Sequence, residues 1–129
     1  MANFRQLTKQ ETKLFDCFIK GYCQGLKAVS PVVKEEYEKA NKKVTVSIEP
    51  SDMDILTFWK DTIPFFTRKT LKNCFGEFRK GFMAGYFRRL SSEDPLPKLY
   101  PPHNPDIYEY LKNTWLNDHV YGAKETTSI

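Results

Sequence analysis

One pattern of phenylalanines and glycines occurs twice in this chain and constrains its fold more than any other feature. Residues 15–25 and residues 75–85 both read F-x-x-F-x-K-G-(aromatic)-x-x-G, at a separation of sixty positions. Residues three or four positions apart share one face of an α-helix. Both segments therefore predict a helix that carries phenylalanines and glycines on the same side.

A glycine inside a helix costs about 1 kcal/mol relative to alanine, so the paired glycines need a compensating role. The simplest role is close approach of a second backbone, as small residues at this spacing allow between membrane helices. We therefore predict that the two helices pack through the following residues: Phe18, Gly21, Gly25, Phe78, Gly81 and Gly85. Two alternatives stay open: the glycines kink or end their helices, or the repeat is a recurring local solution without duplication.

The later copy lies within residues 67–90, which keep a helical period without a proline and which we expect to form one helix. This stretch holds seven of the twenty basic residues and one acidic residue, Glu77. The basic residues define a candidate partner-binding face: Arg68, Lys69, Lys72, Arg79, Lys80, Arg88 and Arg89. Such a face suits a phosphate backbone, an acidic protein surface or an anionic ligand, and it is also typical of a solvated helix whose aliphatic stems cover neighbouring rings.

The remaining pattern predicts a mainly α fold, a compact bundle of four to five helices. Start signals for the other helices are the Thr8–Glu11 capping box, Ser30-Pro31, Ser51 with Asp54, and Asn104-Pro105. The expected helices run from 8 to 28, from 31 to about 43, from 51, and from 105 to a stop near Gly122. Residues 44–48 alternate apolar and polar side chains and give the only strand signal. An extended connector is the alternative for that segment.

Two segments carry expectations about burial. The helix after Ser51 is apolar nearly all round and is followed by Ile63, Phe65 and Phe66, so both parts are expected in the core. Residues 91–105 hold five of the eight prolines, which predicts an extended, partly polyproline segment over the surface and no helix.

Length and composition indicate one domain over residues 1–129, with flexible ends at 1–6 and 123–129. Three cysteines without paired spacing are typical of free, buried thiols in a reducing compartment. No signal peptide and no membrane span are apparent, so we expect a cytoplasmic protein without membrane partners. Aromatic residues make up 15% of the chain, and some of these rings are expected in a homo-oligomer interface.

Catalytic and cofactor chemistry finds little support. His103 and His119 lie on different elements, and no metal-binding spacing or phosphate-binding glycine loop occurs. Asp118-His119 is a candidate general base with Cys74 as a remote nucleophile, but nothing in the sequence ties them together. We therefore expect no enzyme, no metal and no cofactor.

The interpretation that follows is a non-catalytic binding protein of the adaptor or inhibitor type, as phages and mobile elements often encode, that self-associates and binds a protein partner. The alternatives are nucleic-acid binding through the basic face of helix 67–90, and sequestration of an anionic small ligand between aromatic walls and a basic floor.

Overall fold

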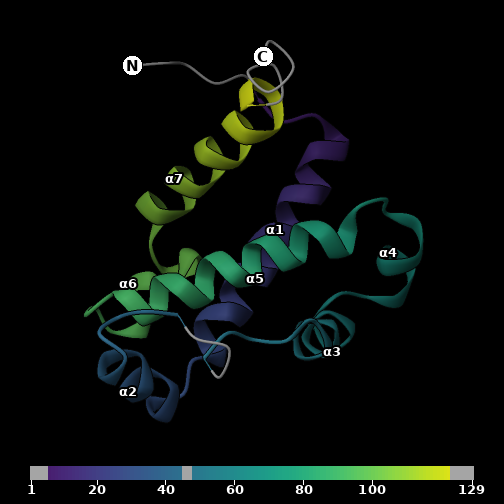
Figure 1. The fold of residues 1–129 in the computed structure, drawn as a ribbon. Coiled ribbons are helices and arrows are strands. Elements are labelled where there is room, and N and C mark those ends of the chain that lie inside the picture. Colours follow the sequence, from purple (N-terminus) through teal and green to yellow (C-terminus); the bar gives the residue numbers. More distant parts are fainter. Residues whose placement is uncertain (1–5, 45–47, 123–129) are drawn as a thin grey trace.

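The computed structural model describes residues 6–44 and 48–122, with side chains as far as residue 119. Within these ranges the chain forms seven α-helices and no strand, so the predicted mainly helical fold is confirmed with a slightly higher helix count (Figure 1). The α-helices are α1 (Lys9–Ala28), α2 (Pro31–Lys39), α3 (Asp52–Thr62), α4 (Phe65–Thr70), α5 (Cys74–Ser91), α6 (Leu96–Leu99) and α7 (Pro105–Leu116). A 3₁₀ turn, η1 (Pro101–His103), precedes α7, and a π-helical segment, η2 (Asn117–Gly122), follows it.

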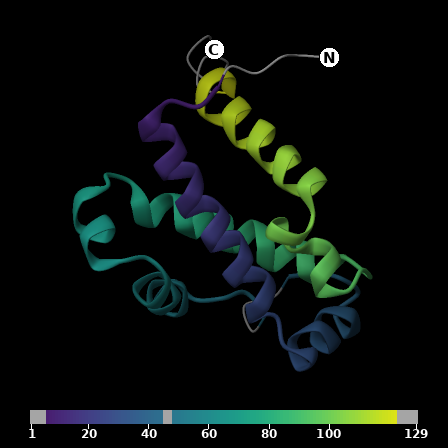
Figure 2. The ribbon, with the colours of Figure 1, turned by 180° about the vertical axis from the view of Figure 1, so that it is seen from behind.

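The two long helices, α1 and α5, cross each other at the centre of the molecule (Figures 1 and 2). At the crossing Gly21 lies against the Phe78 carbonyl, and Gly25 lies against the Phe82 carbonyl one turn further on. Both residue numbers rise together, so the two helices run in the same direction through the contact. A Cβ on Gly21 would lie 2.9 Å from the carbonyl carbon of Phe78, a distance that real Cβ atoms essentially never show.

The crossing has an approximate twofold character that follows the sixty-residue repeat. Gly81 of α5 lies against the Phe18 carbonyl of α1, with 2.8 Å between a built Cβ and the carbonyl carbon. This contact repeats the Gly21–Phe78 contact with the two helices exchanged. Gly85 against Tyr22 repeats the second contact in the same way, at 2.9 Å. The repeated motif thus makes one self-complementary contact between two helices of one chain.

The crossing separates two apolar clusters. α2, α3 and α4 lie on one side of α5, and α7 lies on the other (Figure 1). The first cluster, called the α3 cluster, contains Cys17, Val29, Ile48, Ile55, Ile63, Cys74, Phe78, Phe82, Tyr86 and Leu90. The second, called the α7 cluster, contains Phe15, Ile19, Tyr22, Cys23, Leu26, Leu99, Leu111, Trp115 and Leu116.

The expectation of one helix over residues 67–90 is wrong. α4 ends at Thr70 and α5 begins at Cys74, because Asn73 adopts the left-handed conformation, with φ 64°. Asparagine tolerates this region better than most residues. The segment contains no proline, so periodicity alone gave no sign of the break. Gly76 takes no part in the crossing, since a Cβ there would meet nothing within 4 Å.

Two expectations about burial are also wrong. In α3 only Ile55 is fully buried, and Met53 is 71% exposed. On α4, Phe65 and Phe66 are 66% and 76% exposed, whereas Ile63 before them is buried as expected. The α3 cluster is filled by α5, Ile48 and Ile63 as well as α3, so this short helix needs only one narrow apolar side.

The proline-rich residues 91–105 are not extended throughout, contrary to prediction. They form α6 and the 3₁₀ turn η1, in which Leu99 and Pro101 are buried. Proline is compatible with the first turn of a helix, where its missing N–H would have no partner. Prolines at the starts of short helical turns therefore fold this segment back onto the α7 cluster.

The predicted helix starts agree with the structure. Thr8 and Glu11 form the reciprocal capping box of α1: the Thr8 N–H donates to Glu11 Oε1 at 2.9 Å, and the Glu11 N–H donates to Thr8 Oγ1 at 3.1 Å. The side chains that accept backbone N–H bonds at the starts of α2, α3 and α7 are Ser30, Ser51 and Asn104. α2 ends at Lys39 rather than near residue 43, and Asn41 and Lys42 follow it with positive φ. The predicted strand falls largely on residues 45–47, outside the described residues, as do the predicted flexible ends apart from Gln6.

Candidate functional site: a cavity between α1, α5 and α7

A cavity of about 580 Å³ opens where α7 packs against the crossing of α1 and α5. Five aromatic side chains line it: Phe18, Tyr22, Phe87, Tyr110 and Trp115. Its ionisable lining residues, apart from Tyr22 and Tyr110, are Lys80, Arg88, Asp118 and His119. Ligand cavities in proteins commonly have volumes of roughly 300–1,000 Å³ and apolar walls with a few polar groups, and this cavity has both properties.

Lys80 and Arg88 place two positive charges along the cavity. They are separated by about 12 Å along the axis of α5, at 1.5 Å per residue. Lys80 has a distant ion pair with Glu77, at 3.9 Å, and its side chain is 64% exposed. No carboxylate of the described residues lies within ion-pair distance of Arg88. Burial raises the pKa of Tyr22, while the charge of Arg88 acts on the same hydroxyl in the opposite direction.

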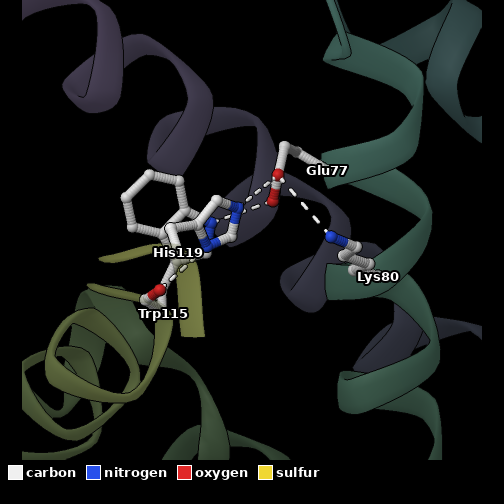
Figure 3. Close-up of polar contacts among 4 residues, drawn as sticks. All are labelled: Glu77, Lys80, Trp115 and His119. Carbon is white, nitrogen blue, oxygen red and sulfur yellow. Dashed lines mark hydrogen bonds and ion pairs between the residues drawn. The ribbon is translucent and has the colours of Figure 1, made fainter. Parts of the chain in front are cut away.

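Two residues that line the cavity, Trp115 and His119, form a polar cluster with Glu77 (Figure 3). The Trp115 indole N–H donates to Glu77 Oε1 at 2.9 Å, and His119 Nε2 lies 2.6 Å from Glu77 Oε2. The Glu77 side chain is only 6% exposed. Burial of a carboxylate is costly unless it is hydrogen-bonded or paired, and here both of its oxygens are engaged.

The geometry of His119 fixes the number of protons in this cluster. Its Nδ1 lies 2.8 Å from the Trp115 carbonyl oxygen, which can only accept, so Nδ1 donates. Its Nε2 faces a carboxylate oxygen, so that contact needs a proton shared between the ring and Glu77. Both ring nitrogens are thereby occupied, and neither is free to act as a general base toward a molecule in the cavity.

The chain reaches this arrangement through the end of α7. Trp115 and His119 are four positions apart, and their rings stack with centroids 3.9 Å apart. The backbone passes from α-helix to the π-helical η2 at Asn117. π-helical turns are rare and often occur at functional sites. Glu77 comes from the first turns of α5, more than thirty residues away along the chain.

The seven basic residues of the predicted partner-binding face have different surroundings. The Arg68 Nε donates to the Ile63 carbonyl at 3.0 Å, and its guanidinium lies over the Trp59 ring. Arg79 pairs with Asp52 of α3 at 2.9 Å. Lys69 lies over the Phe65 ring, Lys72 is exposed in the turn before α5, and Arg89 is half-buried, with a terminal nitrogen that is buried and unbonded. Lys80 and Arg88 both line the cavity described above, and the partner-binding face formed by all seven basic residues stays a prediction.

The six residues predicted to pack the two helices all lie at the α1–α5 crossing. The candidate catalytic pair makes no direct contact among the described residues: the Cys74 sulfur contacts Cys17 and Trp59, whereas the His119 ring bonds to Glu77 and Trp115. Sequence reasoning missed the role of Glu77, although its isolation among seven basic residues was a signal. The role of Trp115 had no signal beyond its place on the apolar side of the last helix.

Within residues 6–44 and 48–122, no group of three or more His, Cys, Asp or Glu residues is placed to hold a metal ion. No helix in these ranges combines the length and the apolar character that a membrane crossing requires. No protein family, no curated protein and no solved structure matches the chain.

Proposed function

We propose that this protein is a non-catalytic binding protein that takes up an anionic small molecule with an aromatic or aliphatic body. The observation that supports the proposal most directly is the α1–α5–α7 cavity, which combines five aromatic walls with the cations Lys80 and Arg88. The apolar body of the ligand packs against the rings, and its acidic group meets the two cations.

The balance of charge favours an anion. Lys80 and Arg88 contribute two positive charges, while the exposed Asp118 contributes one negative charge to the lining. The Glu77–His119 pair holds a shared proton and is neutral as a unit. Arg88 also has no carboxylate partner among the described residues, so a ligand carboxylate, sulfonate or phosphate would be its first strong acceptor.

The surroundings of the two candidate reactive residues, His119 and Cys74, favour ligand binding over catalysis. Both nitrogens of His119 are hydrogen-bonded within the protein. Cys74 is 2% exposed and belongs to the α3 cluster, away from this cavity. The cavity therefore has walls and charges for recognition but no free nucleophile or base from this pair.

The test compares two probes of similar shape, 2-naphthoate and 2-naphthalenemethanol, by isothermal titration calorimetry. A charge-assisted hydrogen bond contributes about 1.5–3 kcal/mol, so we expect the anion to bind roughly ten-fold or more tightly than the alcohol. Replacing Lys80 and Arg88 together by alanine should remove this preference while leaving weak binding of both probes.

Lys60→Ala is the matched control, because Lys60 is an exposed cation on α3 and does not line the cavity. This variant should retain the preference for the anion. Equal affinities for the two probes in the unaltered protein would refute the proposal, as would an anion preference that survives the loss of both Lys80 and Arg88.

Two adjacent exposed phenylalanines on α4 favour a second candidate function, which is binding to a protein surface. The first partner to test is another copy of this chain. Phe65 and Phe66 present 66% and 76% of their surface to solvent. Light scattering over a range of concentrations should show a mass that rises with concentration and falls back when both residues are changed to serine. Tyr110→Ser, at an equally exposed ring on α7, is the control. A mass that stays at 15.1 kDa at every concentration removes this candidate.

A further inference from the structure

Two of the three cysteines meet across the α1–α5 contact. Cys17 lies on α1 and Cys74 is the first residue of α5, and their sulfur atoms are 3.2 Å apart. Both residues are 2% exposed. A disulfide bond is about 2.0 Å long, so the two sulfurs have to approach by little more than 1 Å to bond. The glycine crossing holds the two backbones together next to this pair.

We propose that Cys17 and Cys74 form a site of reversible disulfide bonding that covalently links α1 to α5 when a peroxide reaches it. The site is independent of the ligand cavity, because both residues belong to the α3 cluster and neither lines the α1–α5–α7 cavity.

Cys17 is the sulfur that a small oxidant meets first. It lines a second cavity, of about 380 Å³, between α1 and the segment around α4, whereas Cys74 does not line it. Lys13, Asp16 and Lys20 lie around this cavity. Burial raises the pKa of Cys17, and the neighbouring Cys74 raises it further, while the charge of Lys20 acts in the opposite direction. The thiolate is the reactive form, so the reaction is slow compared with that of an exposed thiol.

Cys74 is positioned for the second step. The indole N–H of Trp59 donates to its sulfur at 3.4 Å, and the same sulfur contacts Cys17. This arrangement holds the Cys74 sulfur beside the atom with which it reacts and leaves it little room to turn away.

The chemistry balances with a peroxide as the two-electron oxidant. The Cys17 thiolate attacks one oxygen of hydrogen peroxide, the O–O bond breaks, and Cys17 becomes a sulfenic acid; the released hydroxide takes up the thiol proton and leaves as water. The Cys74 sulfur then attacks the Cys17 sulfur and forms the S–S bond. The sulfenic oxygen leaves with the Cys74 proton as a second water. Two thiols and one peroxide thus give one disulfide and two waters.

Cys23 provides an internal control. It is buried in the α7 cluster, and burial raises its pKa while a hydrogen bond with Tyr100 acts in the opposite direction. The α7 cluster contains no second cysteine, so Cys23 should stay a thiol during mild oxidation.

The experiment exposes the folded, reduced full chain to hydrogen peroxide, removes the peroxide with catalase, denatures the protein and counts thiols by alkylation and mass spectrometry. We expect the number of free thiols to fall from three to one, with a loss of mass equal to two hydrogen atoms and recovery on addition of a phosphine reductant. Peptide mapping should join Cys17 to Cys74. Cys23→Ser should still form the bond, whereas Cys17→Ser and Cys74→Ser should each form no intramolecular disulfide.

Three results would overturn the proposal. The first is full alkylation of Cys17 and Cys74 after peroxide treatment. The second is conversion of either residue to a sulfinic acid in place of the disulfide, and the third is a crosslink between two chains in place of the internal bond. Because Cys23→Ser leaves the proposed pair untouched, the proposal stays testable even where Cys17→Ser or Cys74→Ser folds poorly.

Discussion

Adding a single methyl group should have opposite effects at two glycines of α5, and this contrast tests the central contact of the fold. Gly81 faces the α1 backbone, where a Cβ would lie 2.8 Å from the carbonyl carbon of Phe18. Gly76, five residues earlier in the same helix, is exposed, and a Cβ there would meet nothing within 4 Å. Alanine at either position gains about 1 kcal/mol of helix propensity, so the difference between the two variants isolates the contact.

The cost at Gly81 follows from what the new methyl group meets. Ordinary contact begins near 3.4 Å, so the Phe18 carbonyl carbon must move by at least several tenths of an ångström from its 2.8 Å separation, and the carbonyl oxygen lies closer still. These atoms belong to a helix backbone, so α1 and α5 must separate as units. Overpacking of this kind costs roughly 1–3 kcal/mol, occasionally more, and a gap of 0.5–1 Å removes about a quarter to a half of the dispersion energy of each affected atom pair. After the propensity gain of about 1 kcal/mol is subtracted, the upper part of that range leaves a net loss of about 1–2 kcal/mol for Gly81→Ala, against a gain of about 0.5–1 kcal/mol for Gly76→Ala.

Urea unfolding followed by circular dichroism at the helix band measures both free energies of unfolding. Gly21→Ala should behave like Gly81→Ala, since the two contacts are related by the sixty-residue repeat. The double variant should lose less than the sum of the single losses, because helices already separated by one methyl group accommodate a second more easily. A Gly81→Ala variant that is as stable as Gly76→Ala would refute the close contact between the backbones, and with it the role assigned to the repeated motif.

Three further perturbations test other parts of the structure. Glu77→Ala should lower the free energy of unfolding by about 2–4 kcal/mol, because it leaves the buried Trp115 N–H without a partner. Glu77→Gln should cost less than about 1 kcal/mol, because its amide accepts from Trp115 and donates to His119. Equal losses in the two variants would contradict the assigned hydrogen bonds. Burial, with smaller contributions from Asp54 and Glu36, raises the pKa of Tyr86 above its ordinary value of 10.0. The stability that the neutral Tyr86 hydroxyl contributes is therefore complete below pH 10 and is lost as the pH rises further. Urea unfolding at rising pH should show this decrease in the free energy of unfolding, and Tyr86→Phe should make the decrease smaller. The Cys17–Cys74 disulfide closes a loop of more than fifty residues and should stabilise the oxidised protein by about 4 kcal/mol in the chain-entropy estimate, which thermal unfolding of the oxidised and reduced forms measures; identical midpoints would contradict it.

The parts of this fold that follow from local chemistry could be predicted from the sequence. The capping box at Thr8 depends on two side chains within one turn, so the residue order alone reveals it. The contact between the two glycine motifs is longer in range, yet it was also predictable because the same motif occurs in both partners. Repetition provided the information about a distant contact that a single copy would have lacked.

Features that depend on distant partners or on a single backbone angle could not be predicted. The left-handed Asn73 splits an otherwise periodic segment, so Arg68 and Lys69 lie on a different helix from Arg79 and Lys80. The exposure of Phe65 and Phe66 depends on how much of the α3 cluster is already filled by other elements. The Glu77–His119 contact joins residues forty-two positions apart through a π-helical turn, and although the isolation of Glu77 among basic residues marks that position, nothing local identifies His119 as its partner.

The sixty-residue repeat also shows where the two sides of the α1–α5 crossing differ chemically. Cys17 of α1 corresponds to Glu77 of α5, and because the crossing has twofold character these equivalent positions face opposite sides of it. On the first side the thiol pair receives an indole N–H from Trp59, and on the second side the carboxylate receives one from Trp115. The backbone contact is the same on both sides, whereas the side chains around it differ. The first side has the Cys17 and Cys74 sulfurs within the α3 cluster, and the second has the hydrogen-bonded Glu77–His119 pair beside the aromatic cavity. The repeated motif therefore determines how the two helices cross, and the residues that vary between its copies determine the chemistry on each side of the crossing.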